Sequence, residues 1–317
     1  MQSGFVGLLE LLGNEAYPLE PASLTELSDL DAVRLAQFRL AWEGFGPKRR
    51  HAILLQLGEL ANSKIELSFE SVNRFALQDS DPPSRAQAIG NLWESEDPQL
   101  ARQLLDMLRA DQVAEVRKAA ADALGSFVLL LAETEDLAQQ LRLEIERGLL
   151  KAVRSDPSKE VRESCLQSLG FSTRDEVPEL IEMAYSSGEG SSLRAALRAM
   201  SRSADSHWAP LVIAKLQDPE PGTRFEAVQA AGELDIRDAS EELVDLLEDV
   251  DDRIRKAAIW SLSQVGGSIA IAALEQLQER ASESEAQLIQ DALDNLEFED
   301  GARELFRLNF DDEDSAA

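Results

Sequence analysis

An acidic residue, five intervening positions and an arginine recur along this chain, and this recurrence constrains its fold more than any other feature. Asp111 precedes Arg117, which opens the segment KAAADALG, and Asp156 precedes Arg162, which opens ESCLQSLG. Four further pairs share the spacing: Asp79 and Arg85, Asp218 and Arg224, Asp249 and Arg255, and Glu43 and Arg49. Self-similarity at a fixed interval is typical of stacked repeats, each of which is one supersecondary unit.

Each arginine opens a segment with helical periodicity. The residues three, four and seven positions after it are mostly small or apolar, as in Ala120, Ala121 and Leu124, and they form one helical face. A second helical segment, for example residues 100–108, separates successive units. A seventh unit centres on Arg194 and has Gly188 in place of the acid. The sequence therefore predicts an all-α chain, a right-handed α-solenoid or superhelix of about eight helical hairpins.

The recurring residues resemble the HEAT repeat, a helical hairpin with an aspartate in its turn and a valine-arginine pair opening its second helix. In repeat length the chain is close to the PBS-lyase-type HEAT repeats of bacteria, and the resemblance extends over residues 29–296. It implies a structural ladder, in which the aspartate and arginine join adjacent repeats through hydrogen bonds at the turns. The residues that match these positions are Asp79, Arg85, Asp111, Arg117, Asp156, Arg162, Asp218, Arg224, Asp249 and Arg255.

The ends of the chain depart from the pattern. Residues 1–27 are predicted to form an irregular N-terminal arm, and residues 28–296 a single solenoid domain. The 45 residues between Arg117 and Arg162 predict a longer helical hairpin within residues 126–156. Residues 297–317 end in DDEDSAA and are predicted to be an acidic C-terminal tail that is partly disordered.

The charge of the chain limits its partners. It has 60 acidic and 31 basic residues, a net charge of −29. Such a surface repels nucleic-acid phosphates and anionic lipids and favours a basic protein partner, although solubility alone or a salty habitat would also account for it. No apolar run of about 20 residues is present to span a membrane. Cys165 is the only cysteine, which fits a reducing cytoplasm.

Residues with catalytic chemistry are scarce. His51 and His207 are the only histidines and lie far apart in the sequence. No metal-binding histidine motif, dinucleotide-binding glycine pattern or phosphate-binding loop is present. Cys165 occupies a position that holds alanine in four other units and is expected to be buried. The sequence therefore predicts no catalytic residues, no metal, no cofactor and no enzymatic activity.

Two neighbouring units carry aromatic residues where the others are polar. The first and fifth positions after the arginine are expected to face solvent, and they hold Phe225 in one unit and Trp260 in the next, with Gln229 between them in the sequence. Aromatic residues are over-represented at the centres of interfaces. The three residues are predicted to bind a partner; the alternative is a register shifted by one residue, which would place both aromatic side chains in the core.

Arg194, Arg198 and Arg202 recur every four residues and form a positive stripe on one helical face. One interpretation is that their guanidinium groups bind an acidic or phosphorylated segment of a partner. The other is that they pair with acids of this chain such as Glu163, Glu189 and Asp205. A run of acids over residues 238–252 is a further candidate contact for a basic partner. Trp42, Trp93 and Trp208 are expected to be core residues.

These observations favour a cytoplasmic, monomeric scaffold or adaptor that binds a protein or peptide on its concave face. The resemblance implies an alternative, a phycobilin lyase or isomerase-like subunit, because repeats of this type occur in those enzymes. A nucleic-acid-binding HEAT protein is a third reading, which the net charge disfavours.

Overall fold

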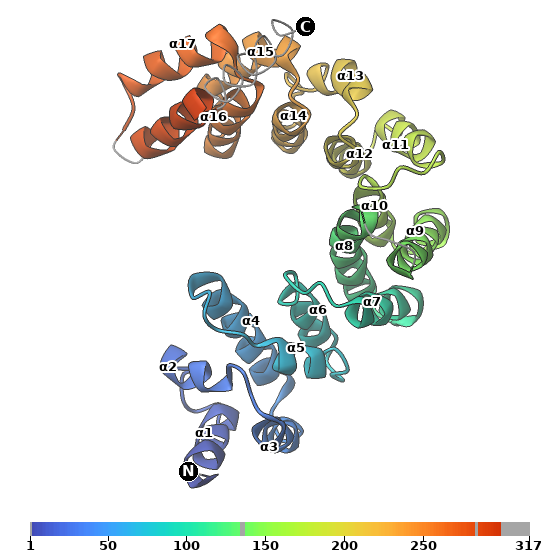
Figure 1. Ribbon diagram of the computed structural model, residues 1–317, viewed down its shortest axis with the longest axis vertical. Helices are drawn as coiled ribbons and strands as arrows, with labels where there is room; N and C mark the ends of the chain where they lie inside the picture. The colour runs from blue at the N-terminus through green and yellow to red at the C-terminus, as the bar shows by residue number, and fades with distance from the viewer. Residues whose placement is uncertain (1, 134–136, 283–284, 299–317) are drawn as a thin grey trace, which may run out of the picture. The chain divides into compact units, whose positions relative to one another are not determined.

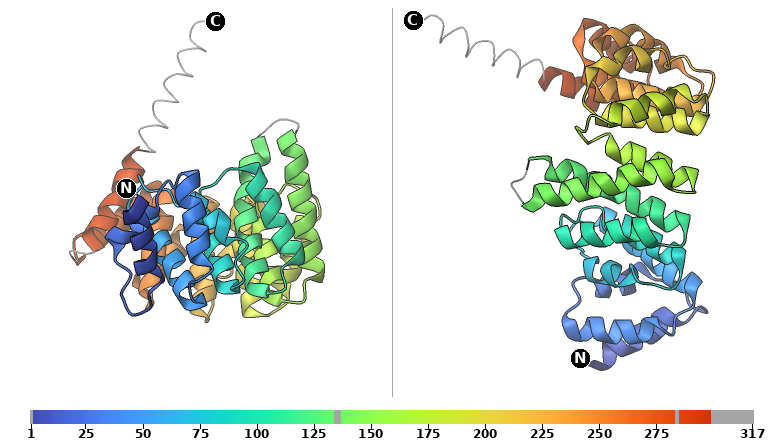
Figure 2. Two further views of the ribbon diagram at one scale, coloured as in Figure 1. Left: turned by 90° about the horizontal axis from the view of Figure 1, so that it is seen from below. Right: turned by 90° about the vertical axis from the view of Figure 1, so that its right-hand side faces the viewer.

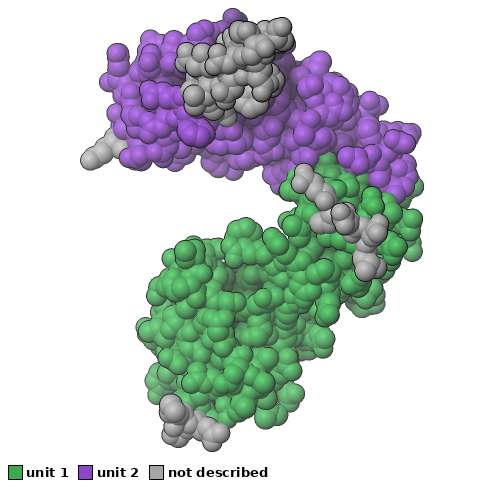
Figure 3. Space-filling model, viewed as in Figure 1, with its two compact units in different colours: residues 1–172 green, residues 173–317 purple. Residues whose placement is uncertain are grey.

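The computed structural model describes residues 2–133, 137–282 and 285–298, which form helices, turns and loops without a strand (Figure 1, Figure 2). The predicted all-α solenoid class is confirmed. The chain divides into two compact units, residues 1–172 and 173–317 (Figure 3), whereas the repeat pattern predicts a single solenoid domain over residues 28–296.

The described residues of unit 1 form ten α-helices with two short 3-10 helices. They are α1 Gln2–Gly13, α2 Pro21–Leu24, η1 Thr25–Leu27, α3 Ala32–Trp42, α4 Pro47–Ser63, α5 Glu70–Ala76, α6 Pro82–Gly90, α7 Pro98–Ala110, α8 Ala114–Leu130, η2 Leu131–Glu133, α9 Leu137–Ser155 and α10 Lys159–Leu169.

Unit 2 continues the same alternation with shorter first helices. Its elements are α11 Val177–Ser186, α12 Gly190–Arg202, η3 Ser206–Trp208, α13 Ala209–Ile213, α14 Pro221–Glu233, η4 Arg237–Ala239, α15 Ser240–Asp245, η5 Leu246–Glu248, α16 Asp252–Val265 and α17 Gly267–Gln278. Residues 285–298 are also helical.

The helices of each unit form two layers. We call α4, α6, α8, α10, α12, α14 and α16 the second helices, because each is the second member of its hairpin. Within unit 1, α4, α6, α8 and α10 pack side by side, with α7 and α9 behind them; within unit 2, α12, α14 and α16 pack in the same way. The small and apolar positions of each second helix, such as Ala120, Ala121 and Leu124, are buried between the layers, as the helical spacing predicts.

The second helices share one register. The ladder arginine is the fourth residue of α6, α8, α10, α14 and α16. In α4 that fourth residue is Arg50, not Arg49 as the sequence pattern indicates, and in α12 it is Leu193, not Arg194. Helix α4 begins at Pro47 and α12 begins at Gly190, and these starting residues set the register of each helix. The spacing of acid and arginine alone places that register one residue off in both helices.

Close approach of neighbouring second helices rests on a glycine and a serine. A Cβ on Gly125 of α8 would lie 2.8 Å from Ser168 Oγ of α10, and that hydroxyl donates to the Ala121 carbonyl at 2.8 Å. The same arrangement recurs in unit 2, where a Cβ on Gly232 would lie 2.9 Å from Ser261 Cα, and Ser261 Oγ donates to a carbonyl of α14 at 2.7 Å. Both joints therefore require glycine, because any larger residue would push the helices apart.

The N-terminal segment differs from the sequence-based prediction. Residues 2–13 form helix α1 instead of an irregular arm, because Phe5, Leu9 and Leu12 fall on one face and are buried. Arg49 helps to hold this helix and the turn after it in place, since its guanidinium donates to the Leu12 and Tyr17 carbonyls at 2.5 and 3.0 Å. At the other end, residues 297 and 298 finish a helix, and the rest of the predicted acidic tail lies outside the described residues.

Candidate interaction surfaces

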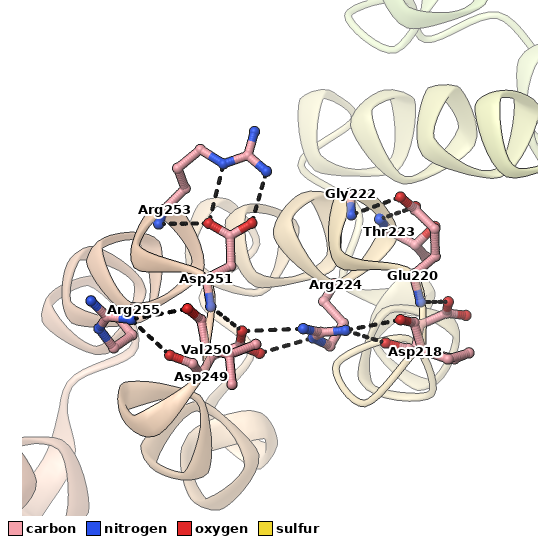
Figure 4. Close-up of polar contacts among 11 residues, drawn as sticks. Asp218, Glu220, Gly222, Thr223, Arg224, Asp249, Val250, Asp251, Arg253 and Arg255 are labelled. Atoms are coloured by element: carbon pink, nitrogen blue, oxygen red, sulfur yellow. Dashed lines mark hydrogen bonds and ion pairs between the residues drawn. The ribbon is translucent and has the colours of Figure 1, made fainter.

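The recurring aspartates and arginines form a hydrogen-bonded ladder, seen for unit 2 in Figure 4. Arg224 donates to both carboxylate oxygens of Asp249 in the next repeat, at 2.9 and 3.1 Å, and to the Asp218 carbonyl of its own repeat at 2.8 Å. Asp249 also accepts from the Asp251 amide at 2.8 Å, which closes the turn before α16. Asp249 thus accepts hydrogen bonds both from an amide of its own turn and from the arginine of the preceding repeat.

Unit 1 repeats this geometry at two rungs and in part at a third, whereas Arg162 donates to carbonyls of its own turn. Arg85 donates to Asp111 at 2.9 Å through both nitrogens, and Arg117 donates to Asp156 at 2.8 and 2.9 Å. The first rung is Arg50 on Asp79, at 2.8 Å, and the Trp42 indole shares that carboxylate. The polar residues of the repeat are therefore engaged inside the molecule, and their recurrence carries no information about a partner.

Two of the ladder carboxylates, those of Asp156 and Asp249, are held in their charged form. Burial acts to raise the pKa of Asp156, but the Arg117 hydrogen bond, the Ser158 amide and the guanidinium charges outweigh it and leave the pKa below its ordinary value. The same balance, with burial opposed by Arg224 and the Asp251 amide, lowers the pKa of Asp249. The Asp156 hydrogen bond likewise raises the pKa of Arg117.

The corrected register places the predicted partner-binding residues in two outward rows of unit 2. Arg194, Phe225 and Lys256 are the fifth residues of α12, α14 and α16. Arg198, Gln229 and Trp260 are the ninth residues of the same helices, and Arg202 continues the row one turn further along α12. We call this set, on three helices packed side by side, the unit 2 face.

Two arginines of the stripe, Arg194 and Arg198, have partners inside the chain in addition to the acids considered from the sequence. Arg194 forms an ion pair with Glu220 at 3.0 Å, and Arg198 forms a two-pronged ion pair with Glu226, both on the α14 side of the joint. Glu226 is buried, and its counterpart in α16 is Ala257. Two of the three arginines therefore bridge α12 to α14.

The two aromatic residues on the unit 2 face differ in exposure. Trp260 is 38% exposed, and its ring lies against α14, where a Cβ on Gly232 would come within 2.7 Å of it. Phe225 is half-buried beneath the Arg253 guanidinium, which lies 5.9 Å from the ring centre. Gln229 is half-buried. Neither aromatic side chain is fully buried. The alternative register, which would place both of them in the core, therefore does not describe this face.

The acidic stretch over residues 238–252 is partly neutralised. Asp251 pairs with Arg253 and Asp252 with Lys256, each at 2.8 Å, and Glu248 pairs with Arg280. Salt bridges with these exposed acids reduce the charge available to a basic partner.

The remaining tryptophans separate into two classes. Trp42 and Trp208 are buried, as expected. Trp93 is not a core residue: it is 63% exposed. A sequence signal for this exists, because the position eight residues after the ladder arginine holds Gly58, Gly125, Gly170 and Gly232 in four other repeats, and a tryptophan cannot replace a glycine at a close helix contact.

The described residues give no catalytic constellation. Burial raises the pKa of the Cys165 thiol, which keeps it protonated and unreactive. Within the described residues, no group of three or more histidine, cysteine or acidic side chains is placed to hold a metal ion. None of the described helices is both long and apolar enough to cross a membrane.

Two family models match the chain. The model for HEAT repeats matches residues 209–297, and that for the HEAT repeat matches residues 100–131. The matched segments contain Arg117 and both residues of the Arg224–Asp249 rung. A comparison with curated proteins finds no match.

Several solved structures resemble the chain in fold. The complex of CpcE and CpcF of phycocyanin lyase from Nostoc sp. PCC7120 is 22% identical, with 73% of this chain and 95% of that chain covered and a TM-score of 0.47. Human deoxyhypusine hydroxylase is 17% identical, with 94% and 97% covered and a TM-score of 0.38. A designed armadillo repeat protein in complex with the peptide (KR)4 is 19% identical, with 64% and 100% covered and a TM-score of 0.38.

Proposed function

This chain is a HEAT-repeat protein, and we propose that it is a non-catalytic scaffold that binds a protein partner through the outward rows of its second helices. Stacked helical hairpins present neighbouring helices side by side and so offer an extended surface to a partner. The ladder residues are used within the stack, which leaves the outward rows for recognition.

The observation that carries the proposal is Trp260. The ninth residue of the other second helices is Leu55, Gly90, Asp122, Gln167, Arg198 or Gln229, so tryptophan stands alone among them. Its indole keeps more than a third of its surface in contact with solvent. A large, rigid side chain that is half-embedded loses little conformational freedom on binding, which is why tryptophan is enriched among residues that dominate binding energy.

The chemistry around Trp260 defines the expected contact. Gln229 supplies amide donors and acceptors from α14, and Lys256 lies one turn before Trp260 on α16. Arg194 and Arg198 already pair with Glu220 and Glu226, so an acidic partner segment would have to compete with those carboxylates. We therefore place the partner's anchor at Trp260 and treat the arginines as the rim of the surface.

Affinity capture with quantitative mass spectrometry tests this proposal. The tagged chain, its Trp260→Ala variant and a control variant, Met183→Ala, are used as baits in parallel. Met183 is a matched control because it is an exposed apolar residue of unit 2 on α11, away from the unit 2 face.

We expect at least one protein to be retained by the Met183→Ala bait and reduced about tenfold on the Trp260→Ala bait, the usual loss at a dominant interface residue. Phe225→Ala is expected to give a smaller loss, since that ring is half-buried under Arg253. Equal capture by all baits would remove Trp260 from the contact.

A phycobilin lyase or isomerase-like activity is a second candidate, which rests on the resemblance of the repeats to PBS-lyase-type repeats. Such a protein would bind a linear tetrapyrrole and change its absorption spectrum on mixing. An unchanged spectrum at micromolar protein would exclude it, and the same sample offers a check of the third reading, since filter binding to DNA at low salt should fail for a chain of charge −29.

A further inference from the structure

A groove in unit 1 lies at the ends of three consecutive second helices. Its volume is about 600 Å³, within the range of about 300–1,000 Å³ typical of ligand pockets. We call it the Trp93 groove; it is lined by Trp93, Glu94, Ser95, Glu96, Ser126, Phe127, Leu129, Leu130 and Phe171.

Unequal helix lengths create the groove. Counted from the ladder arginine, α6 ends five residues later at Gly90 and α10 ends seven residues later at Leu169, whereas α8 continues to Leu130. The last turns of α8 therefore extend beyond both neighbours, and Leu129 and Leu130 have no adjacent second helix to cover them. Because α6 ends early, Trp93 is released from the close helix contact that glycine makes elsewhere.

Two apolar side chains of the groove, those of Trp93 and Leu129, are largely open to solvent. Trp93 is 63% and Leu129 55% exposed. The counterparts of Leu129, twelve residues after the ladder arginines of α6 and α10, are Asp97 and Arg174. Among these three helices, apolar residues thus replace polar ones where α8 extends beyond α6 and α10, and a contiguous exposed apolar site of this kind marks an interaction surface.

The charge around the groove has one sign. Glu94 and Glu96 line it, no lysine or arginine does, and neither carboxylate has an ion-pair partner among the described residues. Arg74 donates a hydrogen bond to the lining residue Ser95, but its charge is already shared by Glu70 and Asp97. An apolar strip with unneutralised acids at its rim is complementary to a bulky apolar side chain flanked by lysine or arginine.

We propose that the Trp93 groove binds a short basic, amphipathic peptide segment of a partner protein, with an apolar side chain against Trp93 and Leu129 and cationic side chains at Glu94 and Glu96. The proposal rests on the scaffold function but names a second surface, on a different unit from Trp260. A second copy of this chain is a poor occupant, because two chains of charge −29 repel each other.

Selection from random 12-residue peptides displayed on phage tests the groove while the natural partner is unidentified. The full chain is the target, and each selected peptide is then measured by fluorescence anisotropy against Trp93→Ala, Leu129→Ala and the double variant Glu94→Gln with Glu96→Gln. Ile65→Ala is the matched control, since Ile65 is a 99% exposed apolar residue of unit 1 outside the groove. Trp93 and Leu129 are exposed, so these variants should fold, and circular dichroism checks that they do.

We expect selected peptides to share a bulky apolar residue flanked by lysine or arginine. Their affinity should fall about tenfold or more with Trp93→Ala, the loss expected at an aromatic anchor, and should weaken with the double variant and with added salt. Ile65→Ala should leave it unchanged.

Four outcomes would overturn the groove proposal. The first is the absence of selected peptides or of basic residues in them, and the second is equal binding to Trp93→Ala. The third is a loss of binding with Trp260→Ala alone, which would support the unit 2 face while refuting the groove. Self-association that Trp93→Ala abolishes, measured by analytical ultracentrifugation, would assign the groove to a second copy and would also refute it.

Discussion

Two neighbouring joints of unit 2 are held together in different ways. At the α14–α16 joint, Arg224 reaches a buried Asp249 with both nitrogens, and Gly232 lets Ser261 approach the α14 backbone. At the α12–α14 joint, Leu193 occupies the ladder position, and the bridging arginines lie on the outward face. The α14–α16 joint is stabilised by hydrogen bonds at its turn, and the α12–α14 joint by ion pairs on its outward face.

The difference shows how the fold tolerates a missing rung. Leu193 is buried, so the stack at α12 gains apolar contact where other repeats have a charged pair. The ion pairs of Arg194 and Arg198 replace the lost connection, at positions where solvent weakens them. The arginine stripe therefore has a structural role in this joint, and the functional interpretation must stand on the other residues of the unit 2 face.

The largest effect is expected from breaking a regular rung. Arg117→Ala removes both donors to Asp156, whose side chain is almost fully enclosed. An unpaired buried carboxylate typically costs about 3–5 kcal/mol. Urea unfolding followed by circular dichroism should show this loss in unit 1. A cost below about 1 kcal/mol would mean that water reaches the rung as freely as it reaches a surface pair.

Acidification should act on the same rungs. The pKa values of Asp156 and Asp249 are lowered by folding, so their contribution to stability is present above the unfolded-state pKa and is lost as pH falls through the folded-state pKa. The free energy of unfolding, measured in steps from about pH 6 to about pH 3, should therefore decrease. Arg117→Ala should flatten this dependence, because Asp156 then loses its main stabilising partner; an unchanged slope would contradict the assignment.

Glycine at the close joints gives the next effect. In Gly232→Ala the new methyl group would lie 2.9 Å from Ser261 Cα, so the helices must separate, at a cost of about 1–3 kcal/mol. Gly90→Ala is the matched control, since nothing lies within 4 Å of a Cβ at that position. Thermal unfolding should show Gly90→Ala to be neutral or slightly stabilising. Similar melting temperatures for both variants would contradict the close-packing argument.

The substituted joint should respond more weakly. Arg198→Ala leaves the buried Glu226 without its cation, and we expect a loss of about 1–2 kcal/mol because Arg198 itself is partly solvated. Adding Glu226→Ala should recover most of that loss, since the equivalent residue of α16 is Ala257. A double-mutant cycle by urea unfolding measures this coupling, and additive effects would show that the pair does not join the helices.

Arg194→Ala should have the smallest effect. The side chains of Arg194 and Glu220 are 36% and 48% exposed, and solvent-accessible pairs contribute about 0–1 kcal/mol. The free energy of unfolding should change by less than about 0.5 kcal/mol, and less still in high salt. A loss comparable to that of Arg117→Ala would show that this exposed pair stabilises its joint as much as a regular rung of the ladder does.

The sequence alone indicated the helical hairpins, their stacking and the aspartate and arginine positions. These follow from local rules: helical periodicity, the turn geometry that an aspartate favours and a fixed interval between units. Those rules also bring Gln229 and Trp260 to the corresponding position of adjacent helices. The rules assigned the wrong residue to the ladder position in α4 and α12, Arg49 and Arg194. The register of a helix depends on the residue at which it starts, and the positions of the acids do not mark the start of these two helices.

Tertiary structure decided which side chains remain exposed. Trp93 is exposed because α6 stops early while α8 continues, and Phe225 is half-buried because Arg253 lies over it. Neither fact can be read from the residue itself, since exposure depends on the lengths and contacts of neighbouring helices. The recurring pattern determined the stack, and the unequal helices within that stack determined which apolar side chains stay exposed.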